Sequence, residues 1–444
     1  MKGNIKRLTG TFLIVLLAVL LIGMAALAGI RAYQHAKAEG QVSGIGMQAE
    51  GEELEAGGRE IDKNKLVNEM VSKEEVKTEP QSSIDGKEQT GEAGQYEGKY
   101  GEILADPERM KEEGIYAKEA AGKEEVVLAF AGDICFDESY SNMYYLSQRG
   151  GDIRKCLSED LYKEMTEADI FMVNNEFTYT TRGEPVPEKA FTFRSNPDNV
   201  KLLEDMGVDV VSLANNHAYD YGEVSLLDTL ETMEKAKMPY VGAGRNLEEA
   251  RRPVYFICND IKIAIVSATQ VERVDNPDTK GATENNPGVF RCWGSQLDNL
   301  LETIKEAKAH SDFVIAYIHW GTENTDELDW AQTYQAPLIA EAGADVIIGG
   351  HTHCLQGIDI IKDVPVIYSV GNFWFNSKNL DSCMVKVTVD KQGLKSFRFI
   401  PAKTEGCRTF MAEDQERVRI MEYMRGLSPN VKIEEDGMVR WQEN

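Results

Sequence analysis

The chain is poor in basic residues and in histidine, and it lacks closely spaced cysteine pairs. Its 444 residues include 48 Lys and Arg against 74 Asp and Glu, which gives a formal net charge of -26. Binding to a phosphate backbone needs clustered Lys and Arg, so this composition argues against a nucleic-acid partner. The seven cysteines contain no C-x-x-C pair and form no recognisable disulfide framework. We therefore expect most of them to be buried thiols.

Long apolar runs are also scarce, and the one long enough to span a membrane lies at the N-terminus. Basic residues flank an uncharged run from Leu8 to Ile30. A membrane-spanning helix needs about 20 residues, and the leading positive charges predict an N-terminus inside the cell. Ala26–Ala28 could instead be a signal-peptidase site, whose cleavage would release the protein. Because signal cores are usually about 7–15 residues long, we favour an uncleaved single-pass anchor in residues 1–31.

The next stretch, residues 32–123, has no Phe, no Trp and few branched aliphatic residues. A segment rich in Glu, Gly, Lys, Gln and Ser cannot bury enough apolar area to offset its ordering entropy. We therefore expect a disordered acidic linker between the anchor and the rest of the chain. On this interpretation the protein lies at the cell membrane, with everything after the anchor extracellular.

From residue 124 onward, short apolar runs alternate with amphipathic stretches. The apolar runs are Val126–Ala131, Ile170–Val173, Val208–Leu213, Ile261–Ser267, Phe313–Ile318, Val346–Ile348 and Val366–Ser369. Stretches such as Ser225–Lys237 and Ser295–His310 separate several of them. This alternation predicts an α/β domain with a buried sheet core over residues 124–430, followed by a tail at 431–444. No internal repeat is apparent.

Nearly every predicted strand ends in residues that can bind a metal. These end groups are Asp133, Asn174-Asn175-Glu176, Asn215-Asn216-His217 with Asp220, His319 with Glu323, His351-Thr352-His353, and Asn372. Open α/β sheets bind ligands outside the carboxyl ends of their strands, so these groups should meet at one rim. A mixed oxygen and nitrogen set suits Mn, Fe, Zn or Mg. Two ions about 3.5–4 Å apart would need a bridging carboxylate, so the sequence predicts one or two divalent metals.

The densest of these groups is His351-Thr352-His353, which follows Gly349-Gly350. On an extended backbone, residues i and i+2 point to the same side, so we expect both rings to converge on one point. Glycine before the pair lets the backbone leave the strand and approach whatever the rings hold. Four of the six histidines occupy strand ends of this kind. That concentration indicates a metal site.

The order of these groups resembles that of the poly-γ-glutamate capsule-synthesis (CapA-like) family, a branch of the calcineurin-like metallophosphoesterase superfamily. Six motifs carry the resemblance over about residues 126–376: Gly-Asp, Asn-x-Glu, Asn-Asn-His, His-x-Gly-x-Glu, Gly-x-His-x-His and Gly-Asn-Phe. The stretches Phe193–Pro197 and Val241–Ala250 are also similar to the family pattern. The resemblance implies a four-layer α/β/β/α metallophosphoesterase-like sandwich.

The resemblance also implies a role for each strand-end residue. The implied metal ligands are Asp133, Glu176, Asn216, His319, His351 and His353. Glu176 would bridge two ions, His319 and His351 would bind one of them and His353 the other, and His217 would be the catalytic acid. The superfamily commonly has Asp-x-His at the first motif, whereas this chain has Cys135 at the third position. A thiolate ligand and a weakened first metal site are both open at that position.

Several further polar residues have expected supporting roles. Asp220, Glu323 and Asn372 would orient the ligand rings by hydrogen bonds. Arg194 and Arg245 could bind an anionic substrate through forked hydrogen bonds.

These features predict a membrane-anchored, extracellular, metal-dependent phosphoesterase-type hydrolase that acts in capsule biosynthesis or export. Its substrate would be an anionic polymer such as poly-γ-glutamate, or a phosphorylated intermediate, and its partner a membrane capsule-synthesis complex. An alternative is a non-catalytic module that anchors or guides the polymer and has a vestigial metal site. A weaker alternative, a secreted phosphatase, would require cleavage after Ala28.

Overall fold

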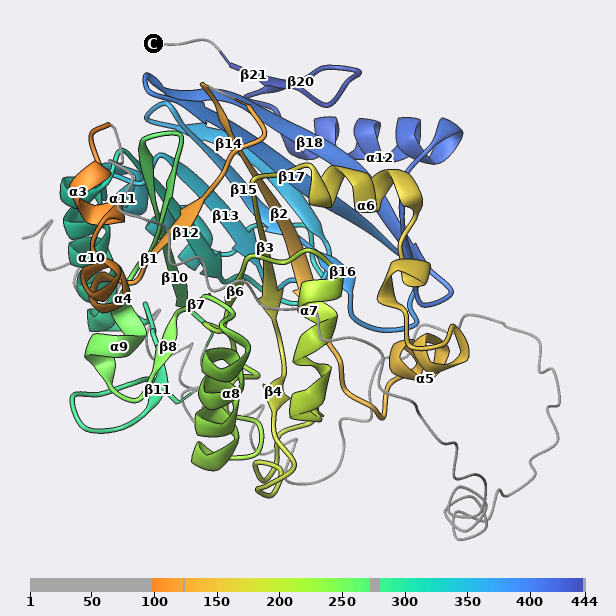
Figure 1. Ribbon diagram of the computed structural model, residues 1–444. Helices are drawn as coiled ribbons and strands as arrows, with labels where there is room; N and C mark the ends of the chain where they lie inside the picture. Colours follow the sequence, from red (N-terminus) through yellow and green to blue (C-terminus); the bar gives the residue numbers. More distant parts are fainter. Residues whose placement is uncertain (1–97, 123, 272–279, 442–444) are drawn as a thin grey trace, which may run out of the picture. The chain divides into compact units, whose positions relative to one another are not determined.

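The computed structural model describes residues 98–122, 124–271 and 280–441 of the chain (Figure 1). The expected anchor at residues 8–30 and most of the expected linker lie outside these ranges. Within the ranges that are described, no helix is long and apolar enough to cross a membrane.

Two large sheets form the centre of the described part. The first contains, in spatial order, β1 (Ile115–Lys118), β9 (Val254–Cys258), β10 (Ile261–Thr269), β12 (Phe313–His319), β13 (Val346–Gly350), β15 (Val364–Val370) and β14 (Leu355–Ile361). The second contains β19 (Arg408–Met411), β18 (Gly393–Glu405), β17 (Leu380–Asp390), β2 (Val126–Ile134), β3 (Ile170–Asn175), β6 (Val210–Ser212) and β7 (Tyr240–Val241), with β16 (Asn372–Trp374) beside β2.

Parallel strands occupy the middle of both sheets. In the first sheet β10, β12, β13 and β15 run parallel to one another. In the second, β2, β3, β6 and β7 do the same. Parallel neighbours end at the same edge, so each sheet presents its polar strand ends along one rim.

The sheets pack face to face around a continuous apolar core. Leu128 and Phe130 of β2 belong to the same buried cluster as Ile263 and Ile265 of β10. Between them, Ala129 points to the opposite face of the second sheet and joins a different cluster. Both faces of β2 are therefore buried, which explains why its sequence is a continuous apolar run rather than an alternating one.

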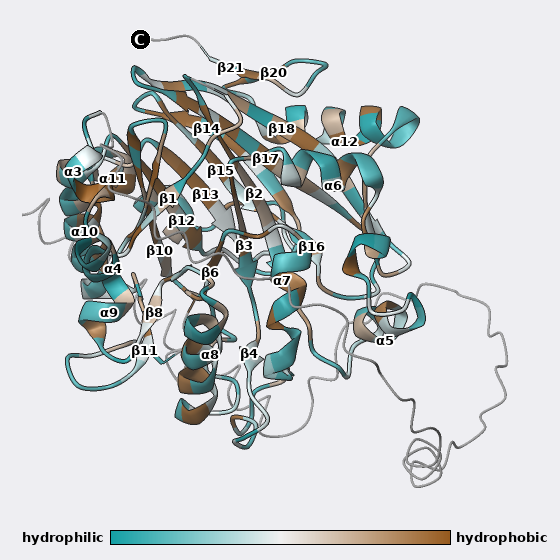
Figure 2. Cartoon of the chain, in the orientation of Figure 1, coloured by the Kyte–Doolittle hydropathy of each residue, from teal (hydrophilic) through white to brown (hydrophobic). Residues whose placement is uncertain are grey.

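Helices cover the outer faces, so the expected α/β class is confirmed and four layers can be followed in Figure 1. Against the second sheet lie α5 (Ser141–Gln148), α6 (Glu159–Thr166), α7 (Lys201–Asp205) and α8 (Glu223–Ala236). Against the first lie α9 (Leu247–Arg251), α10 (Leu297–His310) and α11 (Trp330–Ala342). Figure 2 shows hydrophobic strands enclosed by helices whose outer faces are hydrophilic.

The remaining elements complete the described part. They are α3 (Gly101–Leu104), α4 (Pro107–Glu113), β4 (Thr178–Tyr179) paired with β5 (Arg194–Ser195), β8 (Ala243–Gly244) paired with β11 (Gly288–Val289), α12 (Asp414–Leu427), β20 (Lys432–Ile433) paired with β21 (Val439–Arg440), and the 3₁₀ turns Ile153–Cys156, Pro197–Val200 and Gly294–Gln296. Helix α12 contacts β14 and β18, and Ile420, Met421 and Met424 on it join the core between the sheets.

The structure differs from the expected linker and tail at both ends. Strand β1 pairs in parallel with β9, and Ile115 packs with Tyr100 and Ile257 in a small cluster. At the other end, Ile433 and Val439 are buried in the core between the sheets. Few apolar residues suffice at these places because each segment adds to a sheet or core that the rest of the chain has already formed. Composition alone therefore predicted both boundaries of the α/β domain, at residues 124 and 430, too close to the middle of the chain.

A close approach of two backbones fixes the end of β2. A Cβ atom added at Gly132 would lie 1.7 Å from the carbonyl oxygen of Gly371, which accepts a hydrogen bond from Asp133 N at 3.1 Å. We expect Gly132→Ala to lower the free energy of unfolding by about 3 kcal/mol or more, because neither backbone can move without breaking strand pairing. Chemical denaturation of both proteins measures this difference.

Gly426→Ala is the matched control for Gly132→Ala. Gly426 lies in α12, and a Cβ atom there would meet no atom within 4 Å. In a helix this change should raise stability by about 0.5–1 kcal/mol. Equal stabilities of the two variants would contradict the proposed backbone contact.

Candidate metal centre

The rims of the two sheets bring polar strand ends together from both sides. In the second sheet Asp133 lies at the end of β2, opposite Asn174 of β3, and Glu176 follows β3 directly. In the first sheet His319 ends β12 and pairs with Gly350, after which comes His351. The two sheets therefore deliver carboxylates from one side and imidazoles from the other.

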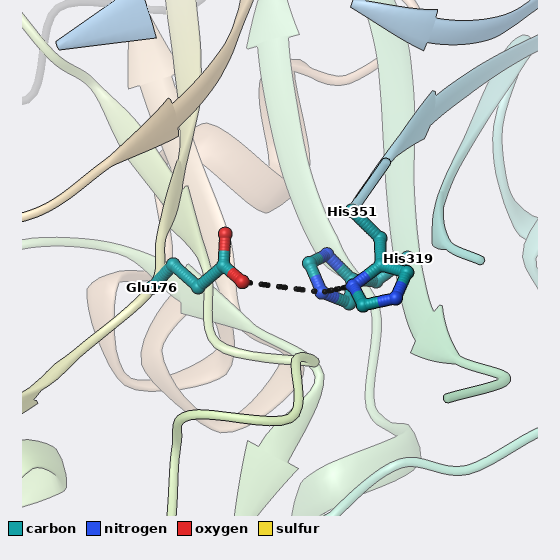
Figure 3. Close-up of side chains that lie close together, drawn as sticks. All are labelled: Glu176, His319 and His351. Carbon is teal, nitrogen blue, oxygen red and sulfur yellow. Dashed lines mark hydrogen bonds and ion pairs between the residues drawn. The ribbon is translucent and has the colours of Figure 1, made fainter. Parts of the chain in front are cut away.

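One group of donor atoms forms around Glu176, His319 and His351, whose ligand atoms all lie within 4.8 Å of one another. Figure 3 shows the Glu176 carboxylate directed toward the two imidazoles. His319 Nε2 lies 3.6 Å from Glu176 Oε1 and 3.1 Å from His351 Nδ1. Asn216 Oδ1 lies 2.8 Å from the same Nε2 atom. Two nitrogens and two oxygens thus face a common point.

A second group shares Glu176 with the first. It consists of Asp133, Glu176 and His353, again with ligand atoms within 4.8 Å. His353 Nδ1 lies 3.3 Å from Asp133 Oδ2 and 2.8 Å from Asn372 Oδ1. Because Glu176 belongs to both groups, its carboxylate holds the position that a bridging ligand would occupy between two ions.

Burial controls the ionisation of these groups. It lowers the pKa of His319 and of His351 well below the ordinary value, so both rings are neutral and can donate a lone pair. Burial, reinforced by the charge of Asp133, raises the pKa of Glu176 well above the ordinary value. Burial also acts to lower the pKa of His353, but the Asp133 carboxylate, 3.3 Å from Nδ1, outweighs it and raises that pKa.

Two carboxylate oxygens at the centre have no hydrogen-bond partner. Both Asp133 Oδ2 and Glu176 Oε1 are buried, and no donor of the described residues satisfies them. A buried, unsatisfied carboxylate oxygen is strongly unfavourable unless a cation compensates it. The mixed oxygen and nitrogen donors suit Mn, Fe, Zn or Mg. The residues present therefore fit a divalent ion at each group.

His217 lies beside the two groups and faces a cavity. Its Nδ1 atom is 2.7 Å from Asp220 Oδ2, and its Nε2 atom is 3.9 Å from Glu176 Oε1. His217 and His353 both line a cavity of about 540 Å³. Burial lowers the pKa of His217. With Nδ1–H donated to Asp220, the Nε2 atom is left facing the centre.

Lys189 is a residue of this site that carries no recognisable sequence signal. Its ammonium group lies 2.6 Å from Asp220 Oδ1, is almost fully buried, and also donates to the backbone carbonyl of Asn216. Asp220 Oδ2 accepts a further hydrogen bond from Phe193 N at 2.6 Å. Lys189 therefore holds the carboxylate that orients His217.

Asn174 belongs to one of the strand-end groups singled out in the sequence, but its specific role was not predicted. Its Nδ2 atom donates to Asp133 Oδ1 at 2.8 Å, and its Oδ1 atom accepts from Asn215 Nδ2 at 3.0 Å. This chain of amides fixes the Asp133 carboxylate so that Oδ2 faces His353.

The histidine pair differs from the extended geometry expected for it. His351 has φ of 94° and His353 has φ of 58°, and their ring centroids lie 6.1 Å apart. The left-handed backbone sends the two rings to different groups, as the family resemblance implied, so the single shared point expected from an extended backbone is wrong. Such conformations in residues other than glycine cost about 1–3 kcal/mol each and concentrate at functional sites.

Cys135 belongs to neither donor group. Its side chain is fully buried in the core cluster beneath the helices of the second sheet, and burial raises the pKa of the thiol well above the ordinary value. Of the two alternatives left open at this position, the geometry therefore excludes a thiolate ligand. The group around Asp133 has fewer strong donors than the group around His319.

Two of the expected supporting residues, Glu323 and Arg245, do not have the contacts predicted for them. Glu323 is exposed and lines the cavity, and within the described ranges it makes no hydrogen bond to a histidine ring. Arg245 is bound by Glu234, with nitrogen–oxygen distances of 2.7 and 2.8 Å, at the molecular surface. Arg194 stacks on the Tyr221 ring at 4.5 Å and lines a smaller, neighbouring cavity. Asp220 and Asn372, in contrast, contact His217 and His353 as expected.

Comparison with known families decides the relationship of this chain. Residues 127–377, more than half of its length, match the family described as "Bacterial capsule synthesis protein PGA_cap". The chain belongs to this family. All the donor residues described above, from Asp133 to Asn372, lie inside the segment that matches PGA_cap.

Individual PGA_cap relatives are moderately similar. The "PGA biosynthesis protein CapA" of Bacillus subtilis is 34% identical over 62% of this chain and 70% of its own length. The "Capsule biosynthesis protein CapA" of Bacillus anthracis is 30% identical over 48% of this chain and 52% of its own. A "Probable polyglutamine synthesis accessory protein" of Mycobacterium tuberculosis is 29% identical over 47% and 56%. The chain thus spans only about half the length of the last two.

Among solved structures, a 5'-nucleotidase from Candida albicans is 12% identical, with a TM-score of 0.35, over 64% of this chain and 53% of its own. This likeness is too low to support an inference about the site of the PGA_cap chain.

Proposed function

We propose that this PGA_cap protein is a metal-dependent hydrolase of the phosphoesterase type that acts in the biosynthesis or export of capsular poly-γ-glutamate or a related surface polymer. The observation that carries the proposal is the pair of donor groups that share Glu176, each with a buried carboxylate oxygen that lacks a hydrogen-bond partner. One or two divalent ions held there would supply Lewis-acid stabilisation of negative charge on a phosphoryl or acyl centre.

The residues around the ions would manage the proton and the water. His217 lines the cavity, and in its doubly protonated form, with Nδ1–H still donated to Asp220, its Nε2 atom would donate a proton to the leaving group. Asp220 accepts the hydrogen bond from Nδ1 and fixes the ring, while Lys189 holds Asp220 in place. The Phe193 ring packs on His217 with centroids 4.4 Å apart and keeps water from that face of the imidazole.

We extend the proposal to substrate, location and partners. The names of the Bacillus relatives support an anionic polymer or a phosphorylated intermediate of its synthesis as the substrate. The apolar run from Leu8 to Ile30 supports a single-pass anchor with the sheets on the extracellular side and a membrane capsule-synthesis complex as the partner. Fractionation tests the anchor, protease accessibility tests the extracellular side, and co-purification tests the partner complex.

The central experiment compares His217→Ala with the wild-type chain. We expect the full-length protein with Mn²⁺, Zn²⁺ or Fe²⁺ to hydrolyse p-nitrophenyl phosphate or its diester. His217→Ala should lower kcat about 10²- to 10⁴-fold without changing the metal content, because His217 supplies a proton and belongs to neither donor group. The exposed His310, whose Nδ1 atom lies 2.7 Å from the helix carbonyl of Glu306, gives the matched control His310→Ala with unchanged kcat.

One observation favours the alternative of a non-catalytic polymer-guiding module. Cys135 stands where the superfamily commonly has a histidine, and it packs into the core. The group around Asp133 therefore contains a single histidine, His353. If the wild-type chain binds metal but hydrolyses neither ester with any of the ions, the metal would be structural and this alternative would replace the hydrolase.

A further inference from the structure

Two cavities near the metal centre are separated by a wall formed by residues 138–139 and 193–194. The larger, of about 540 Å³, is lined by Ser139, Phe193, His217 and His353 among others. The smaller, of about 260 Å³, is lined by Glu138, Thr180, Thr181, Arg194 and Asn196. Consecutive residues thus face opposite sides: Ser139 and Phe193 line the larger cavity, and Glu138 and Arg194 the smaller. The two spaces are neighbours along one surface.

A single carboxylate fixes the wall between the cavities. Asp137 Oδ1 accepts a hydrogen bond from Ser139 N, and Asp137 Oδ2 accepts one from Arg194 N, both at 2.8 Å. Asp137 is itself buried. The spacing between the segment at 138–139 and the segment at 193–194 is therefore set by the fold and does not depend on a bound ligand.

Each cavity has one cation that the fold leaves available. Lys378 lines the larger cavity and is exposed, and Arg194 lines the smaller. Within the described ranges, neither side chain makes a hydrogen bond or an ion pair, and the Arg194 guanidinium only stacks on Tyr221. By contrast, Arg182 is paired with Asp228 and Arg245 with Glu234.

We propose that Lys378 and Arg194 bind carboxylates of one extended polyanionic chain, whose intervening part passes the wall and lies over His217 and His353. This rests on the function proposed above and assigns two binding residues and a path to its polymer, which has a carboxylate on each repeat. An ammonium group and a planar guanidinium are both suitable partners for carboxylates. Phe191, 64% exposed at the mouth of the larger cavity, offers apolar contact to the stem of a repeat.

Two acidic residues on the proposed path of the polymer, Glu138 and Glu323, also affect how tightly it should bind. Glu138 lines the smaller cavity, but its Oε1 atom already accepts hydrogen bonds from Asn196 N and Asn199 Nδ2. Glu323 lines the larger cavity and is exposed. A polyanion must pass it, so its charge opposes binding. The chain as a whole is also acidic, so attraction has to come from local cations.

The test is binding of fluorescently labelled poly-γ-glutamate to the full-length chain, followed by anisotropy at low ionic strength. Arg194→Gln and Lys378→Gln should each raise Kd about three- to five-fold, as expected for exposed charge pairs. Glu323→Gln should lower Kd about two-fold. Arg245→Gln is the matched control, because it removes the same charge from an arginine outside both cavities, and its Kd should stay at the wild-type value.

Equal weakening by Arg194→Gln and Arg245→Gln would overturn the proposal, since net charge alone would then explain binding. Equally tight binding of a labelled neutral dextran by the wild type would also overturn it. Ester hydrolysis by the wild type tests the proposed function separately. If the Kd values follow the expected order but no ester is hydrolysed, the polymer site is supported and the hydrolase function is rejected. If esters are hydrolysed but the Kd values do not follow this order, only the polymer site is rejected.

Discussion

Replacing His351 with glycine should remove the ion expected between Glu176, Asn216 and His319. His351 supplies one of four convergent donor atoms, and its Nδ1 atom lies 3.1 Å from His319 Nε2. Loss of a direct ligand should weaken metal binding at least as much as loss of a supporting residue, which costs up to about 100-fold. Glycine is preferable to alanine here because His351 has φ of 94°, a conformation that glycine adopts without strain.

Metal content and thermal stability measure this result without an activity assay. In the wild type, Mn²⁺ at about 100 times its Kd should stabilise the fold by about 2.7 kcal/mol. His351→Gly should keep the melting temperature of the metal-free protein and lose most of the increase on Mn²⁺ addition. A full Mn²⁺ response in this variant would show that the group around His319 does not hold the ion.

The meeting of the donor residues could be predicted from the sequence because it depends on topology. Asp133 and Glu176 lie at the ends of parallel strands of one sheet, and His319 and His351 at the ends of parallel strands of the other. The carboxyl ends of such strands share a rim, so apolar runs followed by polar residues were enough to indicate one site.

The directions of individual side chains could not be predicted from the sequence. The rule that residues i and i+2 share a side assumes an extended backbone, whereas His351 and His353 are left-handed. Cys135 looked like a possible ligand because it lies two residues from Asp133, yet it packs under the helices. Both outcomes depend on backbone turns at the rim, where strand periodicity no longer applies.

The two arginines could not be ranked from sequence either, because charge pairing is tertiary. Arg245 is neutralised by Glu234 on a neighbouring helix, whereas Arg194 stacks on Tyr221. Lys189 gave no signal for the same reason, since its partner Asp220 lies 31 positions away. Sequence patterns identify local geometry, and they leave partners of this kind undetermined.

Glu176→Gln should have two opposite effects on stability. Glu176 belongs to both donor groups, so its neutralisation should abolish the stabilising response to Mn²⁺. Without metal, however, Glu176 is a buried carboxylate with an unsatisfied Oε1 atom, close to the buried Asp133. Removing its charge should raise the free energy of unfolding in EDTA by about 2 kcal/mol near neutral pH.

The pH dependence separates this explanation from a general packing effect. Burial, with the charge of Asp133, raises the pKa of Glu176 above its ordinary value of 4.5. A carboxyl group with a raised folded pKa contributes stability that is complete below the unfolded pKa and is lost as pH rises through the folded pKa. In EDTA, the advantage of Glu176→Gln over the wild type should therefore be small near pH 4 and grow toward pH 8. An advantage that stays constant over this range would mean that the glutamine acts through packing, and that the wild-type carboxylate does not need a cation to be stable.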